Sequence, residues 1–306
     1  MEELKIYKKI SLINPVMITG WPGMGSVALG VVDYLIRALS AARFAEIKTD
    51  PLSTLDSVIV NNGLAKISPP PNNTFYYARN PDIIIYEGQA QVPGRQGVEL
   101  LNKVLDLAVE FNVKRIYAGA AFPVPVSYKE PSVVYGAVNE RALLVNLRKI
   151  GISPMEGGQI AGLNGLVLGF AKERSIEAVC LLATMPQYAI SLPNPKASGA
   201  IIEALHRLLA FDVDLKELEL YIKDMDDKMA LIEDRVKDVL AVEKEGSELS
   251  TYEKKIPASV MEKVEKLFHE AKNDKAKAII LKRELDRWDL YKTYEDRFLD
   301  LFRDKR

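Results

Sequence analysis

The chain has 306 residues, of which 48% are hydrophobic and 27% charged, a composition typical of a globular protein of about two domains. Its 41 basic and 42 acidic residues nearly cancel, so no nucleic-acid or membrane partner is indicated. A disulfide within the chain is excluded, and a histidine-based metal site or catalytic triad is not expected, because the only cysteine is Cys180 and the only histidines are His206 and His269.

The beginning of the chain is charged and lacks the apolar segment of a signal peptide. No apolar run approaches the ~18 residues needed to span a bilayer. We therefore expect a cytoplasmic protein. The many Lys, Glu and Arg residues, with so few Cys and His residues, also suit a thermophile.

Strand and helix signals alternate from the start of the chain to about residue 211. The run at 82–86 is apolar on both faces, which is typical of a parallel strand buried beneath helices. The sequence thus predicts an α/β domain over residues 1–211, with a layered, mostly parallel sheet flanked by helices. The predicted strands are 16–19, 43–48, 57–60, 75–78, 82–86, 115–120, 152–155 and 178–183, and the predicted helices are 26–39, 97–111, 139–149, 162–173 and 196–209.

Residues 20–25 read Gly-Trp-Pro-Gly-Met-Gly and stand between a predicted strand and a predicted helix, the usual setting of a phosphate loop. A P-loop is excluded because no lysine occurs between Lys9 and Lys48. Residues 23–28 fit the Gly-x-Gly-x-x-Ala dinucleotide pattern, with Glu46 roughly where a ribose-binding carboxylate belongs. We favour a structural interpretation, a tight corner in which Ser26 caps the helix. An anion at the helix N-terminus is compatible with each interpretation.

Two further strand-to-helix junctions could line a ligand site. Glu87 and Gln89 follow the apolar strand at 82–86, and ligands usually sit at the carboxyl ends of such strands. A glycine-rich helix entry begins at Gly157 and Gly158. The structural alternatives are a carboxylate that positions a loop, and close packing of small residues. The candidate ligand or anion loop comprises Gly23, Gly25, Ser26, Glu87, Gln89, Gly157 and Gly158, and no cofactor is assigned to it.

Three other side chains receive structural interpretations. Cys180 lies inside an apolar strand and His206 on a largely apolar helix, so both are expected to be structural. Lys196 begins a helix, where positive charge opposes the helix dipole, so it either faces an acidic group or is solvated. No nucleophile–base pair and no carboxylate pair has convincing spacing, so no catalytic residue is assigned and an enzyme is not expected.

Residues 212–306 form a second predicted region, which is all helical and contains one glycine, Gly246, and one proline, Pro257. Its first helix repeats apolar residues at alternating spacings of three and four, which is the heptad pattern of a coiled coil. These helices could pack as a hairpin or three-helix unit within the chain, or between subunits. The heptad residues are Leu215, Leu218, Ile222, Met225, Met229, Ile232, Val236 and Val239.

Four ordered segments between about residues 10 and 210 resemble motifs of the proteasome assembly chaperone type 2 family. The run at 20–28 resembles its opening motif, and the run at 86–91 its Gly-Glu-Pro-Gln segment, with Ala90 in place of the proline. Residues 158–168 resemble its glycine-rich helix entry. The most specific match is Met-Pro-Gln-Tyr at 185–188, followed by Pro-Asn-Pro-Lys-Ala at 193–197.

The resemblance implies a nucleoside-phosphorylase-like α/β domain of archaeal type that forms homo-oligomers and binds proteasome α subunits or a paralogous assembly factor. Some archaeal relatives are thought to dock through a C-terminal hydrophobic-Tyr-any tripeptide, whereas this sequence ends in Asp-Lys-Arg, so docking by that route is not expected. The functional hypothesis is therefore a non-enzymatic assembly scaffold. The alternative is a nucleotide- or small-anion-binding enzyme on the same fold.

Overall fold

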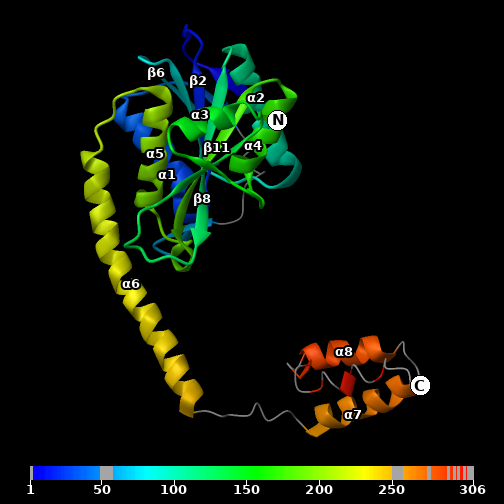
Figure 1. Ribbon diagram of the computed structural model, residues 1–306. Coiled ribbons are helices and arrows are strands. Elements are labelled where there is room, and N and C mark those ends of the chain that lie inside the picture. The colour runs from blue at the N-terminus through cyan, green and yellow to red at the C-terminus, as the bar shows by residue number, and fades with distance from the viewer. Residues whose placement is uncertain are drawn as a thin grey trace. The chain divides into compact units, whose positions relative to one another are not determined.

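The computed structural model describes residues 3–48, 58–249, 258–273 and 277–287, and the single positions 290, 291, 294, 297, 298 and 301 (Figure 1). The chain divides into two compact units, Met1–Arg235 and Val236–Arg306. The first unit contains the α/β fold and the second contains helices. The domain boundary expected after residue 211 stays a prediction.

A nine-stranded sheet forms the centre of the first unit. Its four middle strands, β7, β2, β8 and β11, run parallel to one another. Antiparallel strands flank them on both sides, and β10 pairs in parallel with β9 at one edge. In spatial order the strands are β1 (Glu3–Ile6), β3 (Ala42–Lys48), β6 (Asn73–Ala78), β7 (Ile83–Gly88), β2 (Val16–Gly20), β8 (Arg115–Val124), β11 (Glu177–Pro186), β9 (Val134–Val138) and β10 (Ser153–Pro154).

Helices cover both faces of this sheet, which explains why its middle strands are apolar on both sides (Figure 1). On one face, α1 (Val27–Ala38), α3 (Leu143–Lys149) and α5 (Pro195–Leu209) pack with residues such as Ile83 and Ile85. On the other, α2 (Gly94–Glu110) and α4 (Leu163–Glu173) pack with residues such as Ile84. The predicted layered α/β fold is confirmed.

Close contact between α1 and α5 depends on small residues. A Cβ atom on Gly30 would lie 2.6 Å from the Oγ of Ser198, so only glycine fits at this crossing. The Ser198 hydroxyl is buried and donates a hydrogen bond of 3.0 Å to the carbonyl of Val27. Because α1 and α5 each follow a middle strand, this contact fixes the positions of two loops at the carboxyl edge of the sheet.

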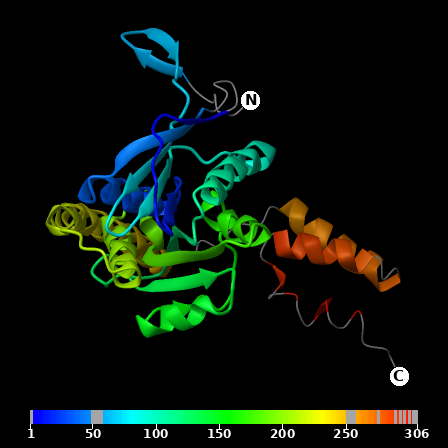
Figure 2. The same ribbon diagram turned by 90° about the horizontal axis from the view of Figure 1, so that it is seen from above.

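A separate two-stranded hairpin follows β3 along the chain. It consists of β4 (Val58–Asn61) and β5 (Leu64–Ile67), which pair only with each other among the described strands. Figure 2 shows this hairpin standing out from the body of the first unit. The sequence predicted a strand at 57–60, of which residue 57 lies outside the described residues, but it did not predict β5, nor the strands β1 and β9.

The helices of the C-terminal region are α6 (Lys216–Leu249), α7 (Ala258–Asn273) and α8 (Lys277–Arg287), which confirms that the region is helical. Leu218 near the start of α6 is buried in the same cluster as α1 and α5. In the second unit, Val264 and Phe268 of α7 pack on Leu281 and Leu285 of α8. Within the described part of the chain, no helix combines the length and the apolar character that crossing a membrane requires.

Candidate functional site

The four segments that resemble the chaperone family all lie around one edge of the sheet. Loops that follow parallel strands emerge at a shared carboxyl edge, which in α/β folds is where functional sites are built. The loop at 21–26 follows β2, the loop at 89–93 follows β7, and the segment at 187–194 follows β11. The glycine-rich segment at 157–162 leads into α4, and hydrogen bonds join the first two residues of α4, Leu163 and Asn164, to the first two loops.

Two side-chain amides fasten these segments together. Asn164 is buried, and its Oδ1 accepts a hydrogen bond of 3.0 Å from the Trp21 amide while its Nδ2 donates one of 3.1 Å to the Trp21 carbonyl. Gln91 donates to the carbonyl of Pro22 at 2.7 Å and accepts from the Leu163 amide at 3.1 Å. Each amide therefore satisfies a donor and an acceptor of backbone that forms no helix or strand ladder at these positions.

The loop at 21–26 is further tied to the segment that follows β11. The Gly25 amide donates to the Ile190 carbonyl at 2.7 Å, and the Gly25 carbonyl accepts from the Asn194 amide at 2.8 Å. The Ser26 amide donates to the Gly23 carbonyl at 2.9 Å. These two amides are thus already bonded to protein carbonyls, which favours a packed corner over an anion cradle.

The prediction that Ser26 caps α1 with its side chain is wrong. Ser26 occupies the N-cap position, but its side chain makes no capping hydrogen bond. The physical reason is its backbone: Ser26 has a φ of 49°, in the left-handed region, whereas a capping serine usually has an extended conformation. Gly25 beside it also has a positive φ, 62°, so the chain makes a sharp turn before the helix starts.

The structure distributes the seven candidate ligand residues over two clefts rather than one. Gly23 lines a cleft of about 380 Å³ together with Gly157 and Gly158. The other four residues line a second cleft of about 460 Å³, between α1, the end of β7 and the start of α5. These four are Gly25, Ser26, Glu87 and Gln89. Whether either cleft holds a ligand stays a prediction.

The second cleft carries an acidic side chain that disfavours anions. Burial raises the pKa of Glu87, and the nearby charge of Asp33 raises it further, whereas a hydrogen bond from the Tyr76 hydroxyl at 3.3 Å opposes the rise. The cation in this cleft, Arg37, pairs with Asp33 and at 3.8 Å with Glu217. The carboxylates of Asp33 and Glu87 would repel a phosphate in this cleft. Arg37 does not offset this repulsion, because it already pairs with two carboxylates.

Next to these clefts, the first half of α6 is fixed to the α/β body by a buried carboxylate, Glu233. It accepts hydrogen bonds from the Ser127 hydroxyl at 2.8 Å, the Tyr188 hydroxyl at 2.8 Å and the Tyr128 amide at 3.3 Å. Burial raises the pKa of Tyr188 to about 12, and its hydrogen bond to Glu233 contributes to the rise. A protonated tyrosine therefore donates to this carboxylate across the whole physiological pH range.

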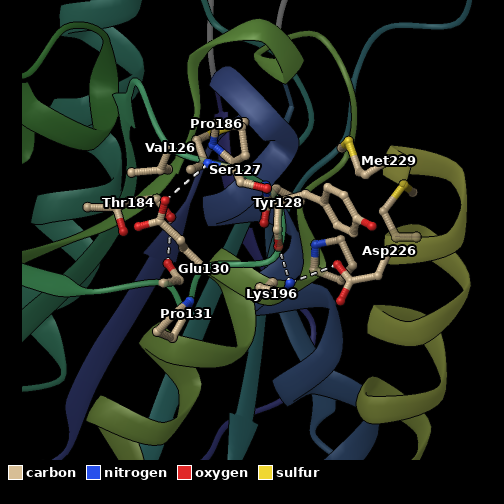
Figure 3. Close-up of a pocket in the computed structure, with 15 residues that line it drawn as sticks. Val126, Ser127, Tyr128, Glu130, Pro131, Thr184, Pro186, Lys196, Asp226 and Met229 are labelled. Carbon is tan, nitrogen blue, oxygen red and sulfur yellow. Dashed lines mark hydrogen bonds and ion pairs between the residues drawn. The ribbon is translucent and has the colours of Figure 1, made fainter. Parts of the chain in front are cut away.

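Lys196, at the first turn of α5, makes the second connection to α6 (Figure 3). Its ammonium group donates to the Tyr128 carbonyl and forms an ion pair with Asp226 of α6 at 2.8 Å. The acidic group that the sequence left open for this lysine is thus Asp226. The space enclosed by these side chains is about 20 Å³, room for about one water molecule, so they form a connection between elements and not a ligand pocket.

The first half of the heptad series faces the α/β body. Leu215, Leu218 and Ile222 join the cluster formed with α1 and α5, and Met225 and Met229 pack beside Lys196. Ile232 is partly buried, while the side chains of the last two members, Val236 and Val239, lie outside the described residues. A role for this seam between subunits stays a prediction.

Cys180 and His206, whose side chains are chemically reactive, lie in environments that indicate structural roles. Cys180 is fully buried in β11, and burial raises the pKa of its thiol to about 12, which confirms that it is a core residue. The Nδ1 atom of His206 contacts the carbonyl of Phe211, which stabilises the end of α5. Among the described residues, no group of three His, Cys, Asp or Glu side chains could hold a metal ion.

Sequence reasoning missed the side chains that hold this edge together. Asn164 and Gln91 lie within quoted motifs, but their partners are 143 and 69 residues away, so local pattern gave no signal for them. Glu233 lies on a helix with many charged residues, so the sequence predicts a solvated carboxylate there. The one available signal was the heptad series, which would have placed Glu233 next to the apolar seam.

Comparison with known proteins identifies a family model and solved structures that match this chain. The model of the PAC2 family matches residues 17–232, and the chain therefore belongs to the PAC2 family. A curated relative, an uncharacterized protein of Methanocaldococcus jannaschii, is 27% identical over 218 residues, covering 70% of this chain and 81% of the relative.

Solved structures of the same fold include two proteins of Pyrococcus furiosus. PbaB, described as an archaeal proteasome activator, is 26% identical, with a TM-score of 0.65 over 76% of this chain and 98% of PbaB. PbaA, described as an archaeal homolog of proteasome-assembly chaperone, is 19% identical, with a TM-score of 0.61 over 78% of this chain and 99% of PbaA. The likeness to PbaA shows the fold alone.

Proposed function

We propose that this protein is a non-enzymatic scaffold of the proteasome-assembly-chaperone kind, which forms homo-oligomers and binds proteasome α subunits or a paralogous assembly factor. The observation that carries the proposal is membership of the PAC2 family together with the likeness to PbaB, which extends over nearly the whole of that protein. The edge of the sheet supports it. The amides of Gly25 and Ser26 and the side chains of Asn164 and Gln91 are engaged in holding loops to one another.

The partner is tested by co-purification. The tagged protein is expressed together with the proteasome α subunits of the same organism, and the eluate is analysed by native mass spectrometry. We expect a complex with α subunits in a fixed stoichiometry. A tagged protein of unrelated fold is the control, and recovery of α subunits no greater than with that control would remove them as partners.

The oligomer and the enzymatic alternative are tested separately. Multi-angle light scattering at micromolar concentration should give a mass above that of one chain, and a strict monomer would contradict the homo-oligomer. Calorimetric titration with ATP, NAD and nucleosides tests the alternative of a nucleotide-binding enzyme. Heat of binding with any of these ligands would favour the enzyme over the scaffold.

A further inference from the structure

The hairpin β4–β5 has one face made entirely of apolar side chains. Its cross-strand pairs place Val58 opposite Ile67 and Val60 opposite Ala65, so these four residues share one face. The other face carries Ile59 and Leu64 but also Lys66 and Asn61. A two-stranded sheet with one apolar face is the pattern of a sheet that packs against something.

Nothing in the described part of the chain covers that face. The exposed fractions of the three larger side chains are 55% for Val58, 64% for Val60 and 68% for Ile67. An isolated two-stranded hairpin is at best marginally stable in water. Burial of these side chains against a partner surface would therefore also stabilise the hairpin itself.

The same chain carries an open groove of matching chemistry. It has a volume of about 570 Å³ and lies beside the loop at 21–26, the start of α2 and the start of α4. Pro22, Val92, Pro93, Leu163 and Leu166 line it, and none of its lining residues is charged. The polar group in it, the amide of Gln91, is already bonded to Pro22 and Leu163. Met24 and Leu166 at the groove are 46% and 44% exposed.

The apolar hairpin face and the uncharged groove fit each other in chemistry. Neither surface carries a charge, so their contact buries no unpaired ion, whereas an acidic or basic partner would gain nothing from either. Since one is a projection and the other a depression on the same chain, a second copy provides the complement of each. Such an interface is heterologous, and heterologous interfaces close into rings when the rotation between copies permits it.

The size of the contact also favours assembly of several copies. A hairpin face of this kind buries a few hundred Å² at most, below the roughly 800 Å² per partner of a standard interface. In a closed ring, however, each copy is held twice, once through its hairpin and once through its groove. Both contacts must then break before a copy can leave.

We propose that the apolar face of hairpin β4–β5 docks into the uncharged groove beside Pro22, Val92 and Leu166 of a second copy, so that copies assemble head to tail. This inference rests on the homo-oligomer of the proposed function and assigns the surfaces that form it.

Charge placed on either surface tests the assembly. Light scattering is measured for the full chain and for Val60→Lys, on the apolar hairpin face, and Leu166→Lys, in the groove. Both side chains are exposed, so neither change threatens the fold. We expect each variant to weaken assembly by roughly tenfold or more, because the lysine would be buried unpaired.

Ile59→Lys is the matched control, since it adds the same charge to the opposite face of the same strand. The control should keep the mass of the unmodified protein. If Val60→Lys and Leu166→Lys also keep that mass, or if Ile59→Lys weakens assembly equally, the inference is overturned while the homo-oligomer stands. If the unmodified chain is itself a monomer, both the inference and the homo-oligomer fail.

Cross-linking identifies the partner surfaces directly. Val60→Cys and Leu166→Cys are prepared as separate variants, mixed, and treated with a short bismaleimide; the buried Cys180 should not react. We expect a product of two chains in the mixture and little of it from either variant alone. Cross-linking of Val60→Cys to itself would indicate a hairpin-to-hairpin contact and overturn the groove. A chain that carries both Val60→Cys and Leu166→Cys is treated in the same way. Cross-linking only within one chain would show that the hairpin covers its own groove and would overturn the contact between copies.

Discussion

At the scale of single residues, the main finding is that two side-chain amides replace backbone pairing at the edge of the sheet. Asn164 bonds both polar groups of the Trp21 backbone, and Gln91 joins Pro22 to Leu163. Buried backbone groups must be paired, because leaving one unpaired costs about 1–3 kcal/mol. These amides therefore stabilise the loop at 21–26 in its observed conformation.

Replacing Asn164 with leucine should lower the free energy of unfolding by about 2–4 kcal/mol, because the buried amide and carbonyl of Trp21 would lose their partners. Urea titration followed by circular dichroism measures the effect. Gln159→Ala is the control, since Gln159 is exposed and should change stability by less than about 0.5 kcal/mol. Equal stability of the Asn164 variant and the unmodified protein would contradict the structural role of this amide.

Glu87 makes stability depend on pH in a predictable direction. Burial raises its pKa in the folded protein, so the folded state binds the proton more tightly than the unfolded state does. The charged form thus destabilises the fold at neutral pH, and this penalty disappears as the pH falls below the unfolded value of about 4.3.

Glu87→Gln should therefore raise the free energy of unfolding at pH 7.5, and the gain should shrink towards zero near pH 4. Urea titrations of both proteins at several pH values provide the comparison. The exposed Glu110→Gln variant serves as control and should track the unmodified protein throughout. A gain that grows on acidification would have the wrong sign and would refute the effect of burial on this carboxyl.

At the scale of whole elements, the first half of α6 is part of the α/β body. Leu218 is buried in the core, Lys196 pairs with Asp226, and Glu233 accepts three hydrogen bonds from Ser127, Tyr128 and Tyr188. An apolar contact, an ion pair and a buried carboxylate therefore follow one another along the same face of the helix. The first members of the heptad series, Leu215, Leu218 and Ile222, pack on the same α/β body.

Glu233→Ala should destabilise the first unit by about 2–3 kcal/mol, because three donors would lose a buried acceptor. Hydrogen exchange should show faster exchange in α6 and in the segment at 126–132, with little change in the middle strands. Glu219→Ala on the same helix is exposed and should leave both measurements unchanged. Unchanged exchange in α6 would show that Glu233 does not hold the helix.

At the scale of the whole molecule, the chain has two units with separate cores. Two clusters of buried residues fill the layers on either side of the sheet, and a third, around Phe268 and Leu281, belongs to the second unit. No buried residue of the third cluster belongs to the other two. Each unit should therefore have a cooperative stability of its own.

A chain that ends at Arg235 should fold, with a single unfolding transition in circular dichroism close to that of the α/β unit in the full chain. A chain that ends at Phe211 should be markedly less stable, because it lacks Leu218, Ile222 and Glu233. The pair of truncations also tests the domain boundary predicted after residue 211. Equal stability of the two fragments would support that boundary, whereas the structure leads us to expect the later one.

The sequence by itself determined the class of fold and the family, because these depend on local signals. Apolar runs such as Ile83–Ile85 predicted buried parallel strands, the helix predicted at 97–111 corresponds to α2, and the four motifs led to the PAC2 family. Strand β1 was not predicted because it lies at the edge of the sheet and has only two apolar residues, Leu4 and Ile6. Strand β9 is apolar but short, and Gly136 at its centre weakens the strand signal.

Only the tertiary structure decided which of these segments meet. The partners of Asn164, Gln91 and Glu233 lie between 45 and 143 residues away, and hydrogen bonds over such separations leave no local pattern in the sequence. The sequence also gave no signal that the seven candidate ligand residues lie in two different clefts. Their distribution depends on how the fold arranges the loops that carry them. Local sequence specifies the elements, whereas the packing of the sheet between two helical layers determines which side chains face one another.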